Sequence, residues 1–236
     1  MSELRAACSW SSGKDSCLAC YKAIRGGYKI DYLMNFISQE FKRVSFHGVE
    51  AELVQLQARA MGIPLLQREV IKAEGAYEKV FRESLRFLKA GGVKSIIAGD
   101  IFLLDVQNWV ERICKEEGLE AVEPLWETPS REVLTEFINA GFKAIVTATK
   151  AELLDESWIG RIVDEKFMED LAKIEGVDLC GENGEYHTFV FDGPNFEKRI
   201  KIHKTEKVLR NNHWFLDIQE YVLEPKGERD VQPISK

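Results

Sequence analysis

Six consecutive residues near the start of the chain could bind a phosphate group: Ser11, Ser12, Gly13, Lys14, Asp15 and Ser16. A phosphate needs several N–H donors that converge from one side, and small residues let the backbone come close. Lys14 adds a mobile positive charge, Asp15 could hold a metal ion or orient the loop, and Ser16 could cap a helix. An apolar run at 4–10 precedes these residues, and apolar spacing typical of a helix follows at 16–25. The sequence therefore predicts a phosphate-binding loop between a first strand and a first helix.

The alternative for the same residues is an ordinary strand-to-helix turn rich in serine and glycine. The pattern G-x-x-x-x-G-K-[ST] does not fit, because Asp15 follows Lys14 and no glycine lies five residues before Gly13. The dinucleotide-binding fingerprint does not fit either, since it needs three spaced glycines. The loop thus matches neither of the two common nucleotide motifs.

A second polar cluster runs from Cys180 to Thr188, with the sequence Cys-Gly-Glu-Asn-Gly-Glu-Tyr-His-Thr. Two carboxylates, an amide, a phenol and an imidazole on one glycine-shaped loop suit the recognition of a small polar substrate. His187 could transfer a proton, and Glu185 could hold a cation. The alternative is an Asn-Gly turn that introduces a strand and leaves its carboxylates in solvent.

Strand-like and helix-like segments alternate up to about residue 117. After the first strand and helix, strands are expected at 30–37, 65–70 and 95–98, and helices at 48–61, 76–90 and 103–117. This alternation predicts a parallel, helix-covered sheet, which binds ligands at the carboxyl ends of its strands. Three polar features lie at such ends: the 11–16 loop, the segment from Ser38 to His47, and Gly99-Asp100. We expect one pocket to contain all three.

The pattern changes after about residue 124. Thr128-Pro129-Ser130 predicts the capped start of a helix at 130–140, and a further helix is expected at 162–174. Strands are expected at 143–148, 188–191, 199–209 and 213–223. We therefore predict an α/β protein in which a parallel-sheet nucleotide-binding domain (1–124) carries a smaller α+β domain (125–224) and a flexible tail (225–236).

Bulk composition narrows the class of protein. The 236 residues are 45% hydrophobic, enough for a full core, and their net charge of −7 argues against broad nucleic-acid binding, which needs a basic surface. No signal peptide is evident, and no apolar stretch approaches the roughly 20 residues that span a membrane. The odd number of cysteines, 5, fits a reducing compartment, and we expect Cys17 and Cys20 to pack in the core. The sequence predicts a cytoplasmic protein with no membrane contact.

The 11–16 loop resembles the S-G-G-x-D-S loop of the N-type ATP pyrophosphatases. Members of that superfamily bind the pyrophosphate end of ATP, adenylate a substrate oxygen and release pyrophosphate. Ser12 stands where their pattern usually has glycine. The resemblance implies an adenine nucleotide alpha hydrolase-like fold for the first domain.

Further motifs, in the same order along about residues 4–195, resemble the diphthine–ammonia ligase family in its compact archaeal form. They are Ser9-Trp10-Ser11, Phe46-His47, Gly99-Asp100-Ile101, Pro124-Leu125-Trp126, Trp158-Ile159-Gly160-Arg161 and the run from Gly181 to Thr188. The resemblance implies that ATP and Mg²⁺ are used to adenylate the carboxylate of diphthine on translation elongation factor 2. Ammonia then forms the amide, diphthamide, with release of AMP and pyrophosphate.

The resemblance also implies a set of site residues. The catalytic residues would be Lys14, Asp15, Asp100, Glu185 and His187, and Asp15 and Asp100 would hold the metal. ATP would contact Ser9, Trp10, Ser11, Ser12, Gly13, Lys14, Asp15, Ser16, Ser38, His47, Gly99 and Asp100. The substrate would contact Glu182, Asn183, Glu185, Tyr186, His187 and Thr188. Tyr186 and Glu185 would together hold the quaternary ammonium of diphthine.

Two other functions remain open at the level of sequence: a tRNA-modifying ATP pyrophosphatase, and a sensor that binds ATP without turnover. The acidic balance disfavours the first, because such enzymes usually carry a basic RNA-binding surface. We further expect a hinge near 124–130 that closes the two domains on ATP, and we consider a homodimer possible.

Overall fold

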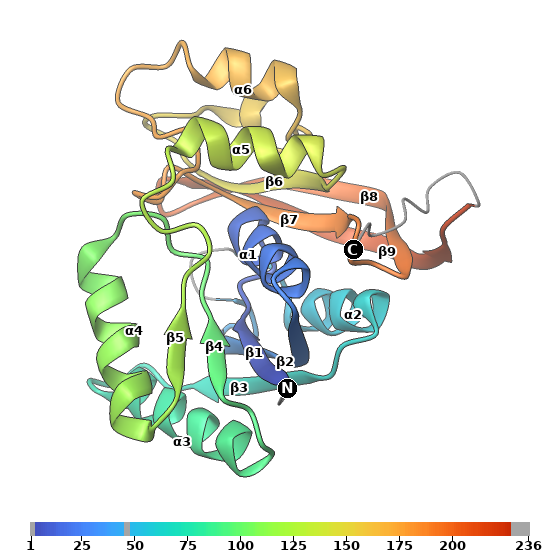
Figure 1. The fold of residues 1–236 in the computed structure, drawn as a ribbon. Coiled ribbons are helices and arrows are strands. Elements are labelled where there is room, and N and C mark those ends of the chain that lie inside the picture. The colour runs from blue at the N-terminus through green and yellow to red at the C-terminus, as the bar shows by residue number, and fades with distance from the viewer. Residues whose placement is uncertain (1–2, 45–47, 228–236) are drawn as a thin grey trace.

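The computed structural model describes residues 3–44 and 48–227, which form two β-sheets with helices between and outside them (Figure 1). The first sheet has the strand order β3-β2-β1-β4-β5, and all its strands are parallel. Its strands are β1 (Leu4–Ser9), β2 (Tyr28–Ser38), β3 (Leu65–Val70), β4 (Ser95–Ile97) and β5 (Glu120–Val122). The predicted parallel α/β domain is confirmed, but the prediction missed β5, because its three residues begin with an exposed glutamate and lack the buried apolar run of β4.

Helices cover both faces of the parallel sheet. Helices α1 (Lys14–Arg25) and α2 (Ala51–Met61) lie on the face toward the second sheet, and α3 (Ala76–Ala90) and α4 (Leu104–Glu117) lie on the other (Figure 1). Alternation along β1 separates the two layers: Ala6 and Cys8 join the core cluster of α1 and α2, whereas Ala7 joins that of α3 and α4. The strand is buried on both sides, as its continuous apolar run predicts.

The second sheet is antiparallel, with the strand order β7-β6-β9-β8. Its strands are β6 (Lys143–Lys150), β7 (Tyr186–Asp192), β8 (Lys198–Arg210) and β9 (His213–Pro225). Helices α5 (Ser130–Asn139) and α6 (Glu165–Leu171) and the short helix η1 (Glu156–Trp158) accompany it. The predicted cap of α5 was wrong: Pro129 takes the N-cap position without a side-chain bond, and the Ser130 hydroxyl instead donates to Asp178 at 2.6 Å.

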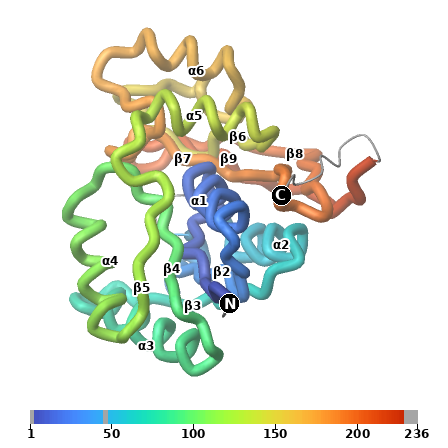
Figure 2. The backbone as a smooth tube through the Cα atoms, viewed as in Figure 1, coloured from blue at the N-terminus to red at the C-terminus, as the bar shows by residue number. Residues whose placement is uncertain are grey.

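One hydrophobic core joins the two sheets. The cluster that includes Leu18 of α1 and Leu53 of α2 continues into Phe137 of α5 and Phe189 of β7. The chain passes between the sheets once through the segment after β5, which rises to α5 in Figure 2. Leu125 in this segment is fully buried. The domain limits 1–124 and 125–224 stay a prediction, and the two parts share their interior.

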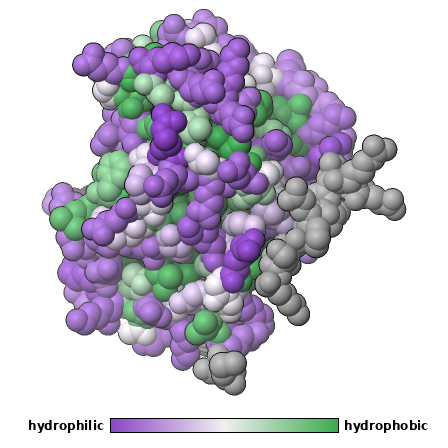
Figure 3. Space-filling view, turned by 45° about the horizontal axis from the view of Figure 1, so that its top comes forward, coloured by the Kyte–Doolittle hydropathy of each residue, from purple (hydrophilic) through white to green (hydrophobic). Residues whose placement is uncertain are grey.

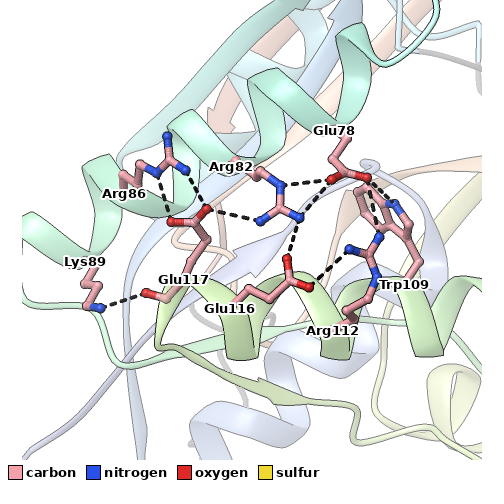
Figure 4. A network of polar contacts seen from close by, with 8 residues as sticks. All are labelled: Glu78, Arg82, Arg86, Lys89, Trp109, Arg112, Glu116 and Glu117. Carbon is pink, nitrogen blue, oxygen red and sulfur yellow. Dashed lines mark hydrogen bonds and ion pairs between the residues drawn. The ribbon is translucent and has the colours of Figure 1, made fainter.

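The outer helices α3 and α4 are joined by a charged network (Figure 4). Arg82 lies at its centre and pairs with Glu78, Glu116 and Glu117. Arg86 adds a second pairing to Glu117 at 2.8 Å. This network lies on the far side of the sheet from α1 and α2, and it ties α3 to the C-terminal half of α4.

Within residues 3–44 and 48–227, no helix is long and apolar enough to cross a membrane.

Candidate active site

A cavity of about 210 Å³ lies where the strand order of the parallel sheet reverses, between the carboxyl ends of β1 and β4. Such switch points are where open α/β sheets bind ligands. The part of the chain that forms the parallel sheet contributes Ser9, Ser11, Lys14, Asp15, Ser16, Gly99 and Asp100 to its wall. The part that forms the antiparallel sheet contributes Cys180, Gly181, Glu182, Tyr186, His187 and Thr188. The structure thus brings the 11–16 loop, Gly99-Asp100 and the 180–188 loop to one place.

The 11–16 loop turns sharply into α1. Ser12 has a φ of +74°, in the left-handed region that favours glycine, which accounts for the glycine usual at this position in the resembled pattern. Gly13 is the N-cap, and Ser16 lies inside the first turn, where its hydroxyl donates to the Gly13 carbonyl at 3.1 Å. The expectation that Ser16 caps α1 was therefore wrong. The first turn of α1 lies at the cavity wall. Its N–H groups have no carbonyl partner one turn earlier in the helix, because the helix begins there.

Hydrogen bonds tie this loop to β7 of the second sheet. The Val190 amide donates to the Ser12 carbonyl at 3.0 Å, and the Lys14 amide donates to the Thr188 hydroxyl at 3.0 Å. The buried Gln57 side chain of α2 donates to the Ser12 and Val190 carbonyls at 3.1 and 2.6 Å. Its oxygen accepts from the Trp10 indole at 2.7 Å. The conformation of the phosphate-type loop therefore depends on both sheets.

The Lys14 side chain lies inside this junction. It is only 4% exposed, and its ammonium donates to Asp15 at 2.8 Å and to the Cys180 carbonyl. It also lies 4.9 Å from the centre of the Tyr186 ring. Burial alone would lower the pKa of Lys14, but the Asp15 carboxylate and its other neighbours raise it well above its ordinary value. Lys14 is therefore a permanent cation at the cavity wall, and its contact with phosphates stays a prediction.

Three carboxyl groups face the cavity. Burial raises the pKa of Asp15, against the opposing effect of Lys14, and burial followed by the charge of Asp15 raises that of Asp100. Burial, with the charges of both aspartates, raises the pKa of Glu182 to about 7. The Ile101 amide donates to Glu182 at 3.4 Å. The carboxylates in the cavity wall thus repel one another, and a bound cation would reduce this repulsion.

These carboxylates fit Mg²⁺ brought in with ATP. One oxygen of Asp15 is buried without a hydrogen-bond partner, so it is available as a ligand. Among the residues that the structure describes, no group of three or more His, Cys, Asp and Glu side chains could hold a metal ion alone. Mg²⁺ at nucleotide sites needs only one or two carboxylates, because phosphates and water supply the other ligands. Asp15 and Asp100 match that requirement.

The 178–188 loop differs from the prediction at two residues. Glu185 is 2% exposed, does not line the cavity, and accepts from the Asp178 amide and the Asn183 side chain at 3.0 and 3.1 Å. The Tyr186 ring forms part of the cavity wall, but it is 1% exposed and its hydroxyl donates to the Leu179 carbonyl at 2.7 Å. One Glu185 oxygen and the Tyr186 hydroxyl are thus used to shape the loop, whereas the second Glu185 oxygen is buried without a hydrogen-bond partner. Binding of a quaternary ammonium by this pair stays a prediction.

A larger cavity of about 950 Å³ adjoins the first. The two share Ser9, Ser11, Asp100, Glu182 and His187 as walls. Trp10 and Asn183 line only the larger one. Ser38 lines neither of these two cavities; it lies in a neighbouring pocket with Phe41 and Arg43, so the expected single pocket does not include it. His47 lies outside the described residues.

Comparison with known proteins decides the family. Residues 4–121 match the Diphthamide synthase N-terminal domain, and residues 129–223 match the Diphthamide synthase C-terminal domain. The chain belongs to the diphthamide synthase family. Similar proteins include the diphthine–ammonia ligases of Homo sapiens, 30% identical over 91% of this chain and 89% of the relative, and of Bos taurus, 30% identical over 98% and 95%. That of Danio rerio is 29% identical over 88% and 90%.

Membership of the diphthamide synthase family confirms the predicted resemblance and the enzyme class, an ATP-dependent amide-forming ligase.

Several residues that line the cavities were not predicted from the sequence. In the larger cavity they include Asn35, Tyr77, Leu103, Lys150, Arg210, His213 and Phe215. Asn35 is an amide within the apolar run of β2, which was a local signal; the patterns around the others gave none.

Cys180 lines the smaller cavity, but its chemistry is that of a structural thiol. It is 2% exposed, and its sulfur donates to the Ser130 carbonyl at 3.3 Å. Burial raises the pKa of the thiol far above neutrality, so it stays protonated and is a weak nucleophile.

Proposed function

We propose that this chain adenylates the carboxylate of diphthine on translation elongation factor 2 and amidates it with ammonia, in the cytoplasm. The products are diphthamide, AMP and pyrophosphate. Family membership supports this reaction, and the observation that carries it is the 210 Å³ cavity at the switch point of the sheet. There a phosphate-type loop, two aspartates and the polar 180–188 loop meet.

The chemistry explains why ATP is needed. A carboxylate is a poor acyl donor, because its oxide is a poor leaving group. Attack of the carboxylate oxygen on the α-phosphorus forms an acyl-adenylate, and pyrophosphate leaves with the electrons of the broken P–O bond. Ammonia then attacks the acyl carbon, AMP leaves, and the nitrogen loses one proton. Positioning and neutralisation of charge supply most of the catalysis in such transfers.

Each wall of the cavity has a proposed role. The amides of the 11–16 loop and the first turn of α1 bind the pyrophosphate, apart from those of Gly13 and Lys14, which donate to the Ser11 and Thr188 hydroxyls. Asp15 and Asp100 would hold Mg²⁺, which would neutralise phosphate charge. Ser9 and Trp10 extend the site into the larger cavity, where the nucleoside lies. Glu182 and His187 line both cavities and face the acyl group. Glu182, which lines both cavities, accepts the proton that the attacking nitrogen loses.

The protonated thiol of Cys180 weighs against the tRNA-modifying alternative in its sulfur-transfer form, which needs a reactive cysteine. All five cysteines of the chain are buried and free of disulfides.

One assay tests the proposal against both alternatives. The chain is incubated with Mg-ATP, ammonium and elongation factor 2 that carries diphthine, and AMP and the amidated factor are measured. AMP that depends on the factor supports the ligase. Dependence on tRNA, or tight ATP binding with no AMP, refutes it.

A pair of variants makes the assay specific to the site. Asp100→Asn removes a carboxylate from the cavity and should lower the rate by about 10²–10³-fold, the usual effect of losing one group that stabilises transition-state charge. Glu83→Gln is the control for loss of one negative charge, because Glu83 is exposed on α3 and lines neither cavity. Equal rates for the two variants would contradict the proposed role of Asp100.

A further inference from the structure

Large apolar side chains are exposed around the carboxyl edge of the parallel sheet. Among the described residues, eleven such side chains are exposed, and six of them follow β2, β3 or β4 in loops or in the first turn of the next helix. The six are Phe41, Ile71, Tyr77, Phe102, Leu104 and Val106, between 38% and 66% exposed. This edge is also the one that contains the cavity.

Two of these residues line cavities at this edge, and two others adjoin a lining residue in the chain. Tyr77 and Leu103 line the larger cavity, and Phe102 and Leu104 flank Leu103 in the chain. Phe41 lines the pocket next to it. In the space-filling view of Figure 3, apolar atoms gather on the left, on the side where Figure 1 places α4.

The fold itself does not require this apolar surface. The buried residues of α4 are Val110, Ile113 and Cys114, whereas Leu104 is 59% exposed and Val106 38%. Single exposed apolar residues are ordinary on protein surfaces, but a group of them around a cavity mouth marks a place that another molecule covers.

We propose that these six residues are the docking surface for the folded protein whose side chain enters the cavity. This inference rests on the proposed function, which requires a substrate carried by a protein. A space of about 210 Å³ holds reacting groups, not a protein, so the protein must lie across the mouth while its side chain reaches inward. The six apolar residues lie at the same edge of the sheet as that mouth, and a protein bound over them would exclude water from the acyl-adenylate.

The surface also indicates the chemistry of the partner. A contact made by Phe, Tyr, Leu, Ile and Val side chains recognises an apolar patch beside the modified residue, and it depends little on salt. The alternative occupant is a second copy of this chain. The experiment below separates these two.

The test compares Leu104→Asp and Phe102→Asp with Val222→Asp. Val222 is 44% exposed on β9 and borders neither cavity, so it is a matched control of similar chemistry. Aspartate at position 104 is compatible with the fold, because the first turn of a helix favours a negative charge. Thermal unfolding of each variant checks that its fold is intact.

The KM for the factor should rise at least 10-fold in Leu104→Asp and Phe102→Asp. The rate at saturating factor and the KM for ATP should stay within 2-fold of the unaltered chain, as should all constants of Val222→Asp. An unchanged KM for the factor in both edge variants refutes the docking surface while leaving the ligase intact. A dimer that Leu104→Asp splits, with an unchanged KM, assigns the surface to a second copy and also refutes it. If the unaltered chain forms no AMP with the factor, the proposed function fails, and the docking surface fails with it.

Discussion

Lys14→Met should destabilise the protein strongly, because the ammonium joins the two sheets rather than projecting into open solvent. The change removes charged hydrogen bonds to Asp15 and to the Cys180 carbonyl, and it leaves Asp15 without its cation. Hydrogen bonds to charged groups contribute about 1.5–3 kcal/mol each. The Asp15 side chain is 25% exposed, so water recovers part of the loss. We therefore expect a decrease of about 3 kcal/mol in the free energy of unfolding.

Urea unfolding measures this change, and Lys22→Met is the matched control on the same helix. Lys22 pairs with Glu136 at 2.8 Å, but the two side chains are 29% and 42% exposed and solvent screens the pair, so its loss should cost less than about 1 kcal/mol. Amide exchange should also rise in the 178–188 loop of Lys14→Met alone. Unaltered stability in Lys14→Met, combined with a large rise in the Kd for ATP, would refute this reasoning and assign Lys14 wholly to the phosphates.

Three further changes test the site and its supports. A Cβ at Gly99 would lie 2.9 Å from the Asp15 carbonyl carbon, so Gly99→Ala should displace the start of α1. The Kd for ATP, measured by calorimetry, should rise at least 10-fold. Gly91→Ala is the control, because its Cβ would have its nearest contact at 3.3 Å, and it should leave this Kd unchanged. Arg82→Met should lower the thermal unfolding midpoint, and 1 M NaCl should shrink the difference, because Arg82 joins three carboxylates at the surface. The folded protein holds the Glu182 proton more tightly than the unfolded chain. Its contribution to stability is therefore complete below about pH 4.5 and is lost as the pH rises through about 7. The ligand-free unfolding midpoint should fall across that range, and less steeply in Glu182→Gln.

The phosphate-type loop could be predicted from the sequence because its signal is local. An apolar strand, small residues and an amphipathic helix follow one another within residues 4–25, and the structure forms them in that order. The parallel sheet followed from repeated local patterns of the same kind. The switch point then placed Gly99-Asp100 beside the loop without any knowledge of side-chain contacts.

The contacts that fix the site could not be predicted, because they join residues far apart in the chain. The Lys14 ammonium bonds a carbonyl 166 residues away, and Gln57 reaches a carbonyl 133 residues away. Polar residues in the 180–188 loop looked equivalent in sequence, yet Glu185 is buried whereas Glu182 faces the cavity. Only the folded backbone distinguishes a carboxylate that shapes a loop from one that meets a substrate.

These long-range contacts also determine what a closing motion could look like. Closure about a hinge near 124–130 stays a prediction. A large rotation there would separate Val190 from Ser12 and Thr188 from Lys14, and it would break hydrogen bonds that hold the phosphate-type loop itself. A motion that keeps these bonds must pivot at the contact between the loop and β7, while the outer parts of the second sheet move. ATP would then bind a loop that is already formed, and closure would act on the larger cavity, where the nucleoside lies.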